Sequence, residues 1–294
     1  MKKTYESVLV VCTRRIGDVL LATPVIRSLK AAAPHAAIDM LVFSGTEDVV
    51  TANPDIRRVW TVSPRASVRE SLTMLSQIWR RYDLALSVLP GDRPVFYAWA
   101  AGRHSMATVT PERKSWWKRL LLDGQESFDN YDTHTVVMNL RLLRVLEVAA
   151  ISTPVVTWAS EDEVAARAVF PGMEGSERYA VLHVTPKFVY KAWTASGWAM
   201  LGRWIRNCGV KVVVVGGTSP DERVTVSRIL DGLSFDVIDL TGRVTLRALG
   251  FILSRAALYV GTDTAVTHMA AALGVPTIAL FGPSNPVKWG PWPN

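Results

Sequence analysis

One carboxylate stands alone in a long uncharged stretch near the end of the chain. Asp263 is the only formally charged residue between positions 256 and 287, and His268 follows it five residues later. An apolar run typical of a buried strand precedes Asp263, and apolar residues at helical spacing follow it, which predicts a strand-to-helix turn. Parallel sheets bind ligands at the carboxyl ends of their strands, where helix N-termini offer N–H groups suited to phosphate.

Polar residues gather around this turn, inside the otherwise apolar segment. They are Thr262, Asp263, Thr264, Thr267 and His268. Two structural explanations compete with a ligand site: Asp263 could cap the helix, and His268 could be a core histidine whose hydrogen bonds are satisfied. The gathering of several polar groups at one strand end favours a binding site.

A second group of charged residues follows the first expected strand. It comprises Arg14, Arg15, Gly17 and Asp18. Gly17 permits a tight turn or a close approach to a ligand, and Asp18 falls in the first helical turn, where negative charge is favoured. Asp18 is therefore either a carboxylate base that faces a cleft or a residue that complements the helix dipole and pairs with one of the two arginines.

Two lysines lie on the loop after the first strand of the second half of the chain. Lys187 and Lys191 precede a helix expected from about residue 194. Positive charge on such a loop can hold a diphosphate and stabilise it as it leaves. A dinucleotide fingerprint is absent after the first strand, and so is the lysine motif of P-loop proteins.

Short apolar strands and helical stretches alternate along the chain, which predicts an α/β fold with parallel sheets. Strands are expected at 7–12, 38–43, 59–62, 83–89, 179–184, 210–215, 236–240, 257–260 and 277–281. Helices are expected at 17–32, 68–80, 133–148, 194–207, 221–233, 245–254 and 264–273. Pro24 falls inside the first helix and predicts a kink or a late start. Residues 151–177 read as a connection, so we expect two Rossmann-like domains, 1–155 and 176–294, with a cleft between them.

The 294 residues carry a net charge of +7, and a basic segment around residues 103–119 contributes much of it. Arg113, Lys114, Trp116 and Trp117 lie in this segment. Basic residues mixed with tryptophan suit an anionic membrane surface or a phosphorylated amphiphile. Nucleic acid is the competing partner, although the chain shows no nucleic-acid module, and a solvated basic loop is the structural explanation. The two cysteines are far apart and favour a reducing cytoplasm.

Three runs of the sequence resemble glycosyltransferase family 9, the bacterial ADP-heptose:lipopolysaccharide heptosyltransferases. They are RRIGDVLLATPVIRSLK, KAWTASGW and GTDTAVTHMAAALGVPTIALFGPSNPVKWGP, and they span both halves in the same order as in the family. The resemblance implies a GT-B fold with the acceptor on the N-terminal half and the nucleotide-sugar on the C-terminal half. The family continues with further helices beyond the last motif, which we expect the 176–294 domain to lack.

The resemblance also implies a role for each matching residue. Asp18 matches the proposed catalytic base, and Lys191 matches the lysine that contacts the donor phosphates. Asp263, Thr264 and His268 match the donor-site motif. The implied reaction is inverting and needs neither a metal nor another cofactor.

The leading hypothesis is transfer of heptose from ADP-heptose to a phosphorylated lipopolysaccharide inner-core precursor at the cytoplasmic face of the inner membrane, with peripheral membrane association and no nucleic-acid partner. Arg14, Arg15 and the basic tryptophan segment would contact the acceptor or the membrane. Two rivals remain: a glycosyltransferase or epimerase acting on another nucleotide-sugar, and a non-catalytic protein that binds a nucleotide-sugar or lipid A.

Overall fold

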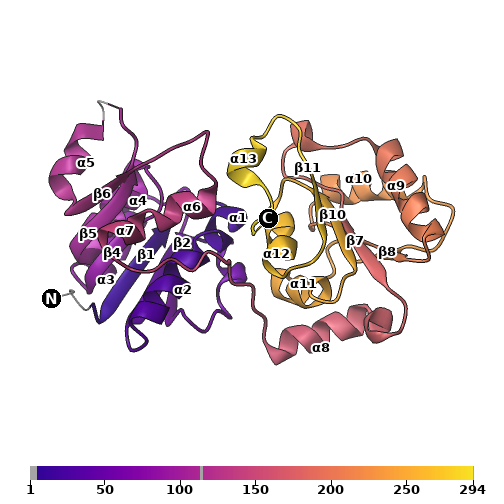
Figure 1. The fold of residues 1–294 in the computed structure, drawn as a ribbon, viewed down its shortest axis with the longest axis horizontal. Helices are drawn as coiled ribbons and strands as arrows, with labels where there is room; N and C mark the ends of the chain where they lie inside the picture. The colour runs from indigo at the N-terminus through magenta and orange to yellow at the C-terminus, as the bar shows by residue number, and fades with distance from the viewer. Residues whose placement is uncertain (1–4, 113–114, 294) are drawn as a thin grey trace. The chain divides into compact units, whose positions relative to one another are not determined.

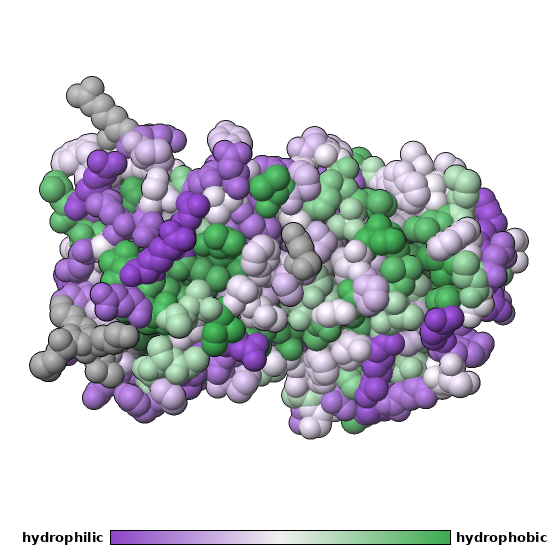
Figure 2. All heavy atoms as spheres, in the orientation of Figure 1, coloured by the Kyte–Doolittle hydropathy of each residue, from purple (hydrophilic) through white to green (hydrophobic). Residues whose placement is uncertain are grey.

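A computed structural model describes residues 5–112 and 115–293 of the chain. The chain divides into two compact units, Met1–Val155 and Val156–Asn294 (Figure 1). Each unit contains one parallel sheet with helices packed on it. Charged side chains cover much of both units, and hydrophobic side chains also reach the surface of each unit (Figure 2).

The first unit contains a six-stranded parallel sheet with the order β3-β2-β1-β4-β5-β6. Its strands are β1 (Ser7–Cys12), β2 (Ala37–Phe43), β3 (Arg58–Val62), β4 (Tyr82–Ser87), β5 (Gly102–Val109) and β6 (Gly124–Ser127). Its helices are α1 (Ile16–Leu20), α2 (Thr23–Ala32), α3 (Val68–Ile78), α4 (Asp92–Ala101), α5 (Trp116–Leu121), α6 (Thr135–Leu140) and α7 (Leu142–Val145). This strand order is that of a Rossmann fold.

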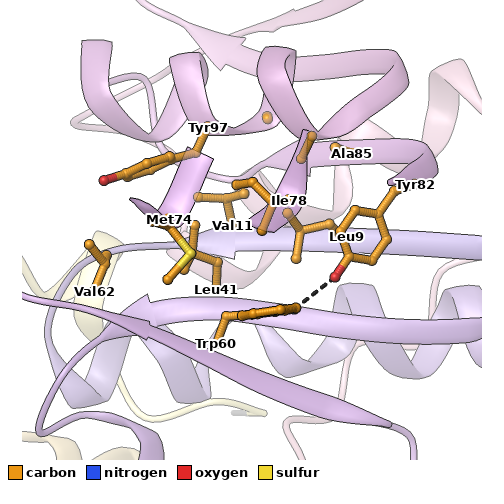
Figure 3. Close-up of a cluster of buried hydrophobic side chains, with 12 residues drawn as sticks. Leu9, Val11, Leu41, Trp60, Val62, Met74, Ile78, Tyr82, Ala85 and Tyr97 are labelled. Carbon is orange, nitrogen blue, oxygen red and sulfur yellow. Dashed lines mark hydrogen bonds between the residues drawn. The ribbon is translucent and has the colours of Figure 1, made fainter. Parts of the chain in front are cut away.

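The helices of the first unit lie on two sides of the sheet, as right-handed crossovers require. Helices α3 and α4 cover one face together, and their core cluster contains Met74 and Ile78 from α3, Tyr97 from α4, and Leu9 and Leu41 from the sheet (Figure 3). The neighbouring connection α5 lies on this face too, because Leu122 at its end packs with Val95 of α4. Helix α6 contacts both α2 and α7 on the opposite side (Figure 1).

A buried carboxylate links three strands of the first sheet. Asp39 on β2 is fully buried and accepts hydrogen bonds from Arg57 Nε at 2.9 Å and Arg57 Nη2 at 2.8 Å. Tyr82 Oη donates to Asp39 Oδ2 at 2.6 Å. Trp60 Nε1 lies 2.7 Å from Tyr82 Oη, the contact drawn in Figure 3. A buried charge is stable only when it is paired and hydrogen-bonded, and Asp39 meets both conditions.

The second unit contains a five-stranded parallel sheet with the order β11-β10-β7-β8-β9. Its strands are β7 (Tyr179–His183), β8 (Lys211–Val215), β9 (Ile238–Asp239), β10 (Leu258–Thr262) and β11 (Thr277–Leu280). Its helices are α8 (Ser160–Val169), α9 (Ala195–Asn207), α10 (Pro220–Leu230), α11 (Leu246–Leu253), α12 (Ala265–Ala272) and α13 (Pro286–Trp289). Its core joins the central strands to α9 and α10, with Trp198 fully buried among them.

The structure corrects three expectations about the elements. The helix expected at 17–32 is two helices, and Pro24 stands in the first turn of α2, where its missing N–H is tolerated. Residues 151–177 are not only a connection: they contain α8, which packs against α11, and Asp162 of α8 pairs with Arg247 at 3.1 Å. The helix expected at 133–148 is divided into α6 and α7.

Candidate active site

The carboxyl edge of the second sheet brings together residues that are far apart in the sequence. Strand β10 pairs with β7, and β7 pairs with β8, so that His183 at the end of β7 is level with Val215 and Gly261. The loops that leave these strand ends therefore share one edge of the sheet. In open α/β sheets this edge is where ligands bind.

Lys191 and Asp263 form an ion pair at this edge. Lys191 ends a short 3₁₀ turn (Val189–Lys191) after β7, and Asp263 directly follows β10. Lys191 Nζ donates to Asp263 Oδ2, and only 13% of the Lys191 side chain and 7% of the Asp263 side chain are exposed. Low exposure strengthens the attraction between opposite charges. The pair holds one cation in a fixed place at the strand ends.

Helix α12 begins beside this ion pair, and no side chain caps it. Its N-cap residue is Thr264, which makes no side-chain cap hydrogen bond. Asp263 is therefore not the N-cap of this helix, and the explanation that Asp263 merely caps the helix is wrong. The first N–H groups of a helix and its positive dipole end suit an anion. The helix terminus offers positive electrostatic potential, and beside it the Lys191 cation is balanced by the Asp263 carboxylate.

His183 contacts Thr264 and carries no charge near pH 7. Its Nδ1 is 3.5 Å from Thr264 Oγ1. Burial lowers the pKa of His183 from its usual value of 6.5 to about 4, because the protonated form would lose its hydration. His183 is therefore neutral near pH 7, and it positions Thr264 without adding charge.

The remaining polar residues of the α12 segment differ in their hydrogen bonding. Thr267 Oγ1 donates to the Thr262 carbonyl at 2.5 Å and lies 3.0 Å from Tyr259 Oη, so Thr267 fixes the end of β10 instead of facing a ligand. His268 is buried on α12. The hydroxyl of Thr262 is buried, and the described part of the chain provides it with no hydrogen-bond partner.

Two threonines that the sequence analysis did not single out lie at the same edge. Thr185 and Thr241 stand two residues beyond the ends of β7 and β9, and both hydroxyls are buried without a partner among the described residues. Gly216, directly after β8, lies between them: a Cβ there would be 3.0 Å from Thr185 Oγ1 and 3.2 Å from Thr241 Cγ2. Buried hydroxyls normally have partners, so this group is suited to hydrogen-bond a ligand. The signal available in the sequence is a small polar residue shortly after each strand.

Lys187 is separate from the Lys191 pair. It lies on the same loop but is exposed to solvent. Of the two lysines expected to hold a diphosphate, Lys191 therefore pairs with Asp263, whereas Lys187 points its charge to solvent. At the neighbouring strand end, after β8, the Gly217 N–H donates to the Glu222 side chain and is thus satisfied within the protein.

In the first unit, Asp18 lies at the carboxyl edge of the other sheet. It is in the first turn of α1, which follows β1, and 7% of the residue is exposed. Arg14 Nε lies 3.4 Å from Asp18 Oδ1, and Arg15 is exposed nearby. Burial raises the pKa of Asp18 above its usual 3.8, while Arg14 and Arg15 oppose that rise. A carboxylate with a raised pKa is a stronger base, so Asp18 is suited to accept a proton.

The basic tryptophan segment contributes residues 103–109 to β5 and residues 116–119 to α5. Trp116 is exposed, and Trp117 is half-buried. Arg113 and Lys114 lie outside the described residues. Lys118 is buried: its Nζ donates to the Pro90 carbonyl at 2.5 Å and pairs with Asp92 Oδ1 at 2.8 Å. Lys118 therefore fixes α5 to the start of α4 instead of presenting its charge to a partner.

Among residues 5–112 and 115–293, no helix is long and apolar enough to cross a membrane. No group of three or more His, Cys, Asp or Glu side chains in the same described ranges could hold a metal ion.

Comparisons with known proteins agree with this architecture. Lipopolysaccharide heptosyltransferase 3 of Escherichia coli K12 is 26% identical over 300 residues, covering 94% of this chain and 82% of that protein. The crystal structure of a family 9 glycosyltransferase from Veillonella parvula matches with a TM-score of 0.87 at 24% identity, covering 99% of this chain and 85% of that one. The Escherichia coli heptosyltransferase WaaC, solved with ADP, matches with a TM-score of 0.78 at 20% identity, covering 97% and 90%.

The expected fold class is confirmed, because both units are α/β with parallel sheets and the matching structures have the GT-B fold. The sequence model of glycosyltransferase family 9 (heptosyltransferase) matches residues 106–294, which is more than half of the chain. That segment includes the whole strand-end edge where Lys191 pairs with Asp263. The chain is a glycosyltransferase and belongs to glycosyltransferase family 9, the heptosyltransferases.

Proposed function

We propose that this enzyme transfers heptose from ADP-heptose to a phosphorylated inner-core acceptor of lipopolysaccharide. The observation that carries this proposal is the Lys191–Asp263 pair beside the uncapped start of α12. Relatives named as lipopolysaccharide heptosyltransferases support the sugar and the acceptor. The likeness in fold to a heptosyltransferase solved with ADP supports the nucleotide.

The second unit would bind the donor. Lys191 and the first N–H groups of α12 receive the diphosphate, and Asp263 holds the lysine in place and lies nearest the sugar together with Thr264. Lys187 provides a second, solvent-exposed cation for incoming phosphate. Thr185, Thr241 and Thr262 offer buried hydroxyls to the nucleotide side of the donor, and His268 supports the helix that carries the site.

The first unit would bind the acceptor, with Asp18 as the base. Asp18 accepts the proton of the acceptor hydroxyl as that oxygen attacks the anomeric carbon, and the bond to the diphosphate breaks with its electron pair leaving on ADP. A single displacement of this kind inverts the anomeric centre. Lys191 and the α12 terminus stabilise the charge that develops on the diphosphate, so the transfer needs no metal ion. Arg14 and Arg15 would contact the phosphorylated acceptor.

The location we propose is the cytoplasmic face of the inner membrane, where the protein would act as a peripheral protein. Basic residues next to exposed tryptophan support this location, since this combination suits the surface of anionic membranes. The tryptophans are Trp116 and Trp117 on α5, and the basic residues Arg113 and Lys114 precede them in the sequence.

The nucleotide preference tests the donor assignment before any transfer is measured. Thermal shift with ADP, ADP-heptose, UDP and UDP-sugars should give the largest stabilisation with the adenine compounds, because binding to the native state raises Tm. Preference for UDP ligands would overturn the heptose proposal and favour a different nucleotide-sugar. Binding of ADP-heptose with no transfer to an inner-core acceptor would instead favour a non-catalytic binding protein.

A further inference from the structure

Helix α3 carries more apolar surface than its core covers. Its outer apolar residues are Val68, Leu72 and Trp79, which stand at positions i, i+4 and i+11 of one helical stripe. Leu75, at i+7, is half-buried and packs against the core cluster. Met74 and Ile78 form the neighbouring stripe that faces the core (Figure 3). Leu72 is 60% exposed and Trp79 is 53% exposed, so the outer stripe remains in contact with solvent.

Helices α4 and α5 extend this apolar surface. Phe96 and Trp99 lie on the outer side of α4, and the rings of Trp79 and Trp99 meet edge to face with centroids 5.8 Å apart. Phe96 contacts Trp99 in turn, with centroids 5.3 Å apart. On α5, Trp116 and Leu120 are 62% and 75% exposed at i, i+4 spacing. We name the outer surface of these helices the α3–α5 face, defined by Leu72, Trp79, Phe96, Trp99, Trp116 and Leu120.

The same part of the chain accounts for the whole net positive charge of the protein. Residues 57–119 contain 12 Lys and Arg against four Asp and Glu, a net charge of +8. The whole chain has 33 basic and 26 acidic residues, so the rest of it carries a net charge of −1. On the described helices, Arg69, Arg80 and Arg119 are exposed and adjoin Val68, Trp79 and Leu120 in the sequence, whereas Lys118 is buried and paired with Asp92.

We infer that the α3–α5 face docks on an anionic phospholipid bilayer. Tryptophan prefers the membrane interface, where its ring is buried and its N–H remains hydrated, and arginine pairs with anionic headgroups. Arg80 lies over both rings of the aromatic group, 5.7 Å from Trp79 and 5.5 Å from Trp99. A flat apolar patch of low charge would indicate a protein partner. Here the apolar side chains lie among cations, which favours an anionic membrane.

This inference deepens the proposed function, because it assigns a surface to the membrane association that a lipid-linked acceptor requires. The α3–α5 face belongs to the first unit, to which we assign the acceptor. Helices α3 and α4 share one core cluster with the sheet, and Lys118 joins α5 to the start of α4. The docking residues are thus fixed on a rigid support.

Vesicle binding by the full chain tests the inference. Co-sedimentation is measured with vesicles of equal parts phosphatidylglycerol and phosphatidylcholine, and with vesicles of phosphatidylcholine alone. Wild type should bind the anionic vesicles at least tenfold more strongly, and added salt should weaken that binding. Leu72→Glu and Leu120→Glu should each reduce the partition coefficient at least tenfold, because each removes apolar area from the interface and adds a repelled charge.

A matched control lies in the second unit. Met200 on α9 is 63% exposed, close to Leu72, so Met200→Glu makes the same chemical change outside the α3–α5 face. It should leave vesicle binding within twofold of wild type. Equal loss in Met200→Glu, unchanged binding in the two leucine variants, or equal binding of wild type to both vesicle types would each overturn the inference. A change of oligomeric state in Leu72→Glu with unaltered vesicle binding would overturn it in favour of a protein interface.

Transfer to a water-soluble, deacylated acceptor separates this inference from the proposed function. The two leucine variants should retain wild-type turnover on that acceptor while losing vesicle binding. Vesicle binding that follows the expected pattern in a protein without transferase activity would overturn the proposed function and support the docking surface. Transferase activity without vesicle binding would overturn the docking surface alone.

Discussion

Replacing Lys191 by methionine separates the two consequences of its ion pair, which are stability of the second unit and affinity for the donor. The Lys191→Met change leaves the Asp263 carboxylate without its cation, although only 7% of that side chain is exposed. Breaking a buried ion pair by removing one partner costs about 3 kcal/mol. For a unit of this size the expected fall in Tm is about 6–12 °C.

The double variant Lys191→Met, Asp263→Asn provides the control for charge. It removes both ionised groups, so we expect it to recover about 2 kcal/mol of the loss, which is a large coupling energy for one pair. Lys187→Met is the matched control for lysine removal on the same loop. Lys187 is exposed, and its replacement should change stability by less than about 0.5 kcal/mol.

Donor affinity should respond differently from stability. If Lys191 receives the diphosphate, Lys191→Met loses charge-assisted hydrogen bonds of about 1.5–3 kcal/mol, which weakens ADP binding about 10- to 100-fold. The double variant should remain as weak, because its lysine is still absent. Calorimetric titration with ADP and thermal unfolding without ligand measure the two quantities. Additive losses of Tm in the double variant, or wild-type ADP affinity in Lys191→Met, would refute the assigned role.

Three further outcomes follow from the structure. Asp18 must be ionised to act as a base, and burial raises its pKa. In the pH profile of kcat/KM, activity should therefore be lost on the acid side at a pH above 3.8. Arg14→Gln should shift this loss to a higher pH, because Arg14 lowers the pKa of Asp18. The pKa of His183 is lowered to about 4 in the folded state. The free energy of unfolding should therefore fall by about 3 kcal/mol as the pH drops from 6.5 to 4, because the unfolded state binds a proton first. In His183→Gln, chemical unfolding should show a smaller pH dependence of this free energy over the same range. Asp39→Ala removes the acceptor of Arg57, Trp60 and Tyr82 and should cost about 3 kcal/mol in chemical unfolding, with a cost below 1 kcal/mol contradicting the assigned role of the network.

Central strands could be read from the sequence because both of their faces are covered. Such strands appear as continuous apolar runs, and β1 and β8 show this pattern. The edge strand β6 has an alternating pattern of half-buried and exposed residues, and β5 contains polar residues, so neither was expected. Helix α8 was missed because its acidic first turn resembles a linker until its contact with α11 is known.

The candidate site was predictable in its parts but not in its contacts. Asp263, Thr264 and Lys191 were found from their places at strand ends and from the family resemblance. Pairing of Lys191 with Asp263 joins residues 72 positions apart and depends on β7 and β10 being neighbours in the sheet, which periodicity does not determine. Thr185 and Thr241 were missed for the same reason, since their hydroxyls become a group only when three strand ends meet around Gly216.

The most direct test of the central claim is transfer by the purified chain with ADP-heptose and a deacylated inner-core acceptor. Released ADP is measured together with the heptosylated product, with a chelator present. We predict one ADP for each product, no loss of rate from chelation, and a fall in turnover of at least 100-fold in Asp18→Asn, the size expected for removal of a general base. Turnover retained by Asp18→Asn would contradict the assignment of the base, and no product from ADP-heptose would contradict the proposed reaction itself.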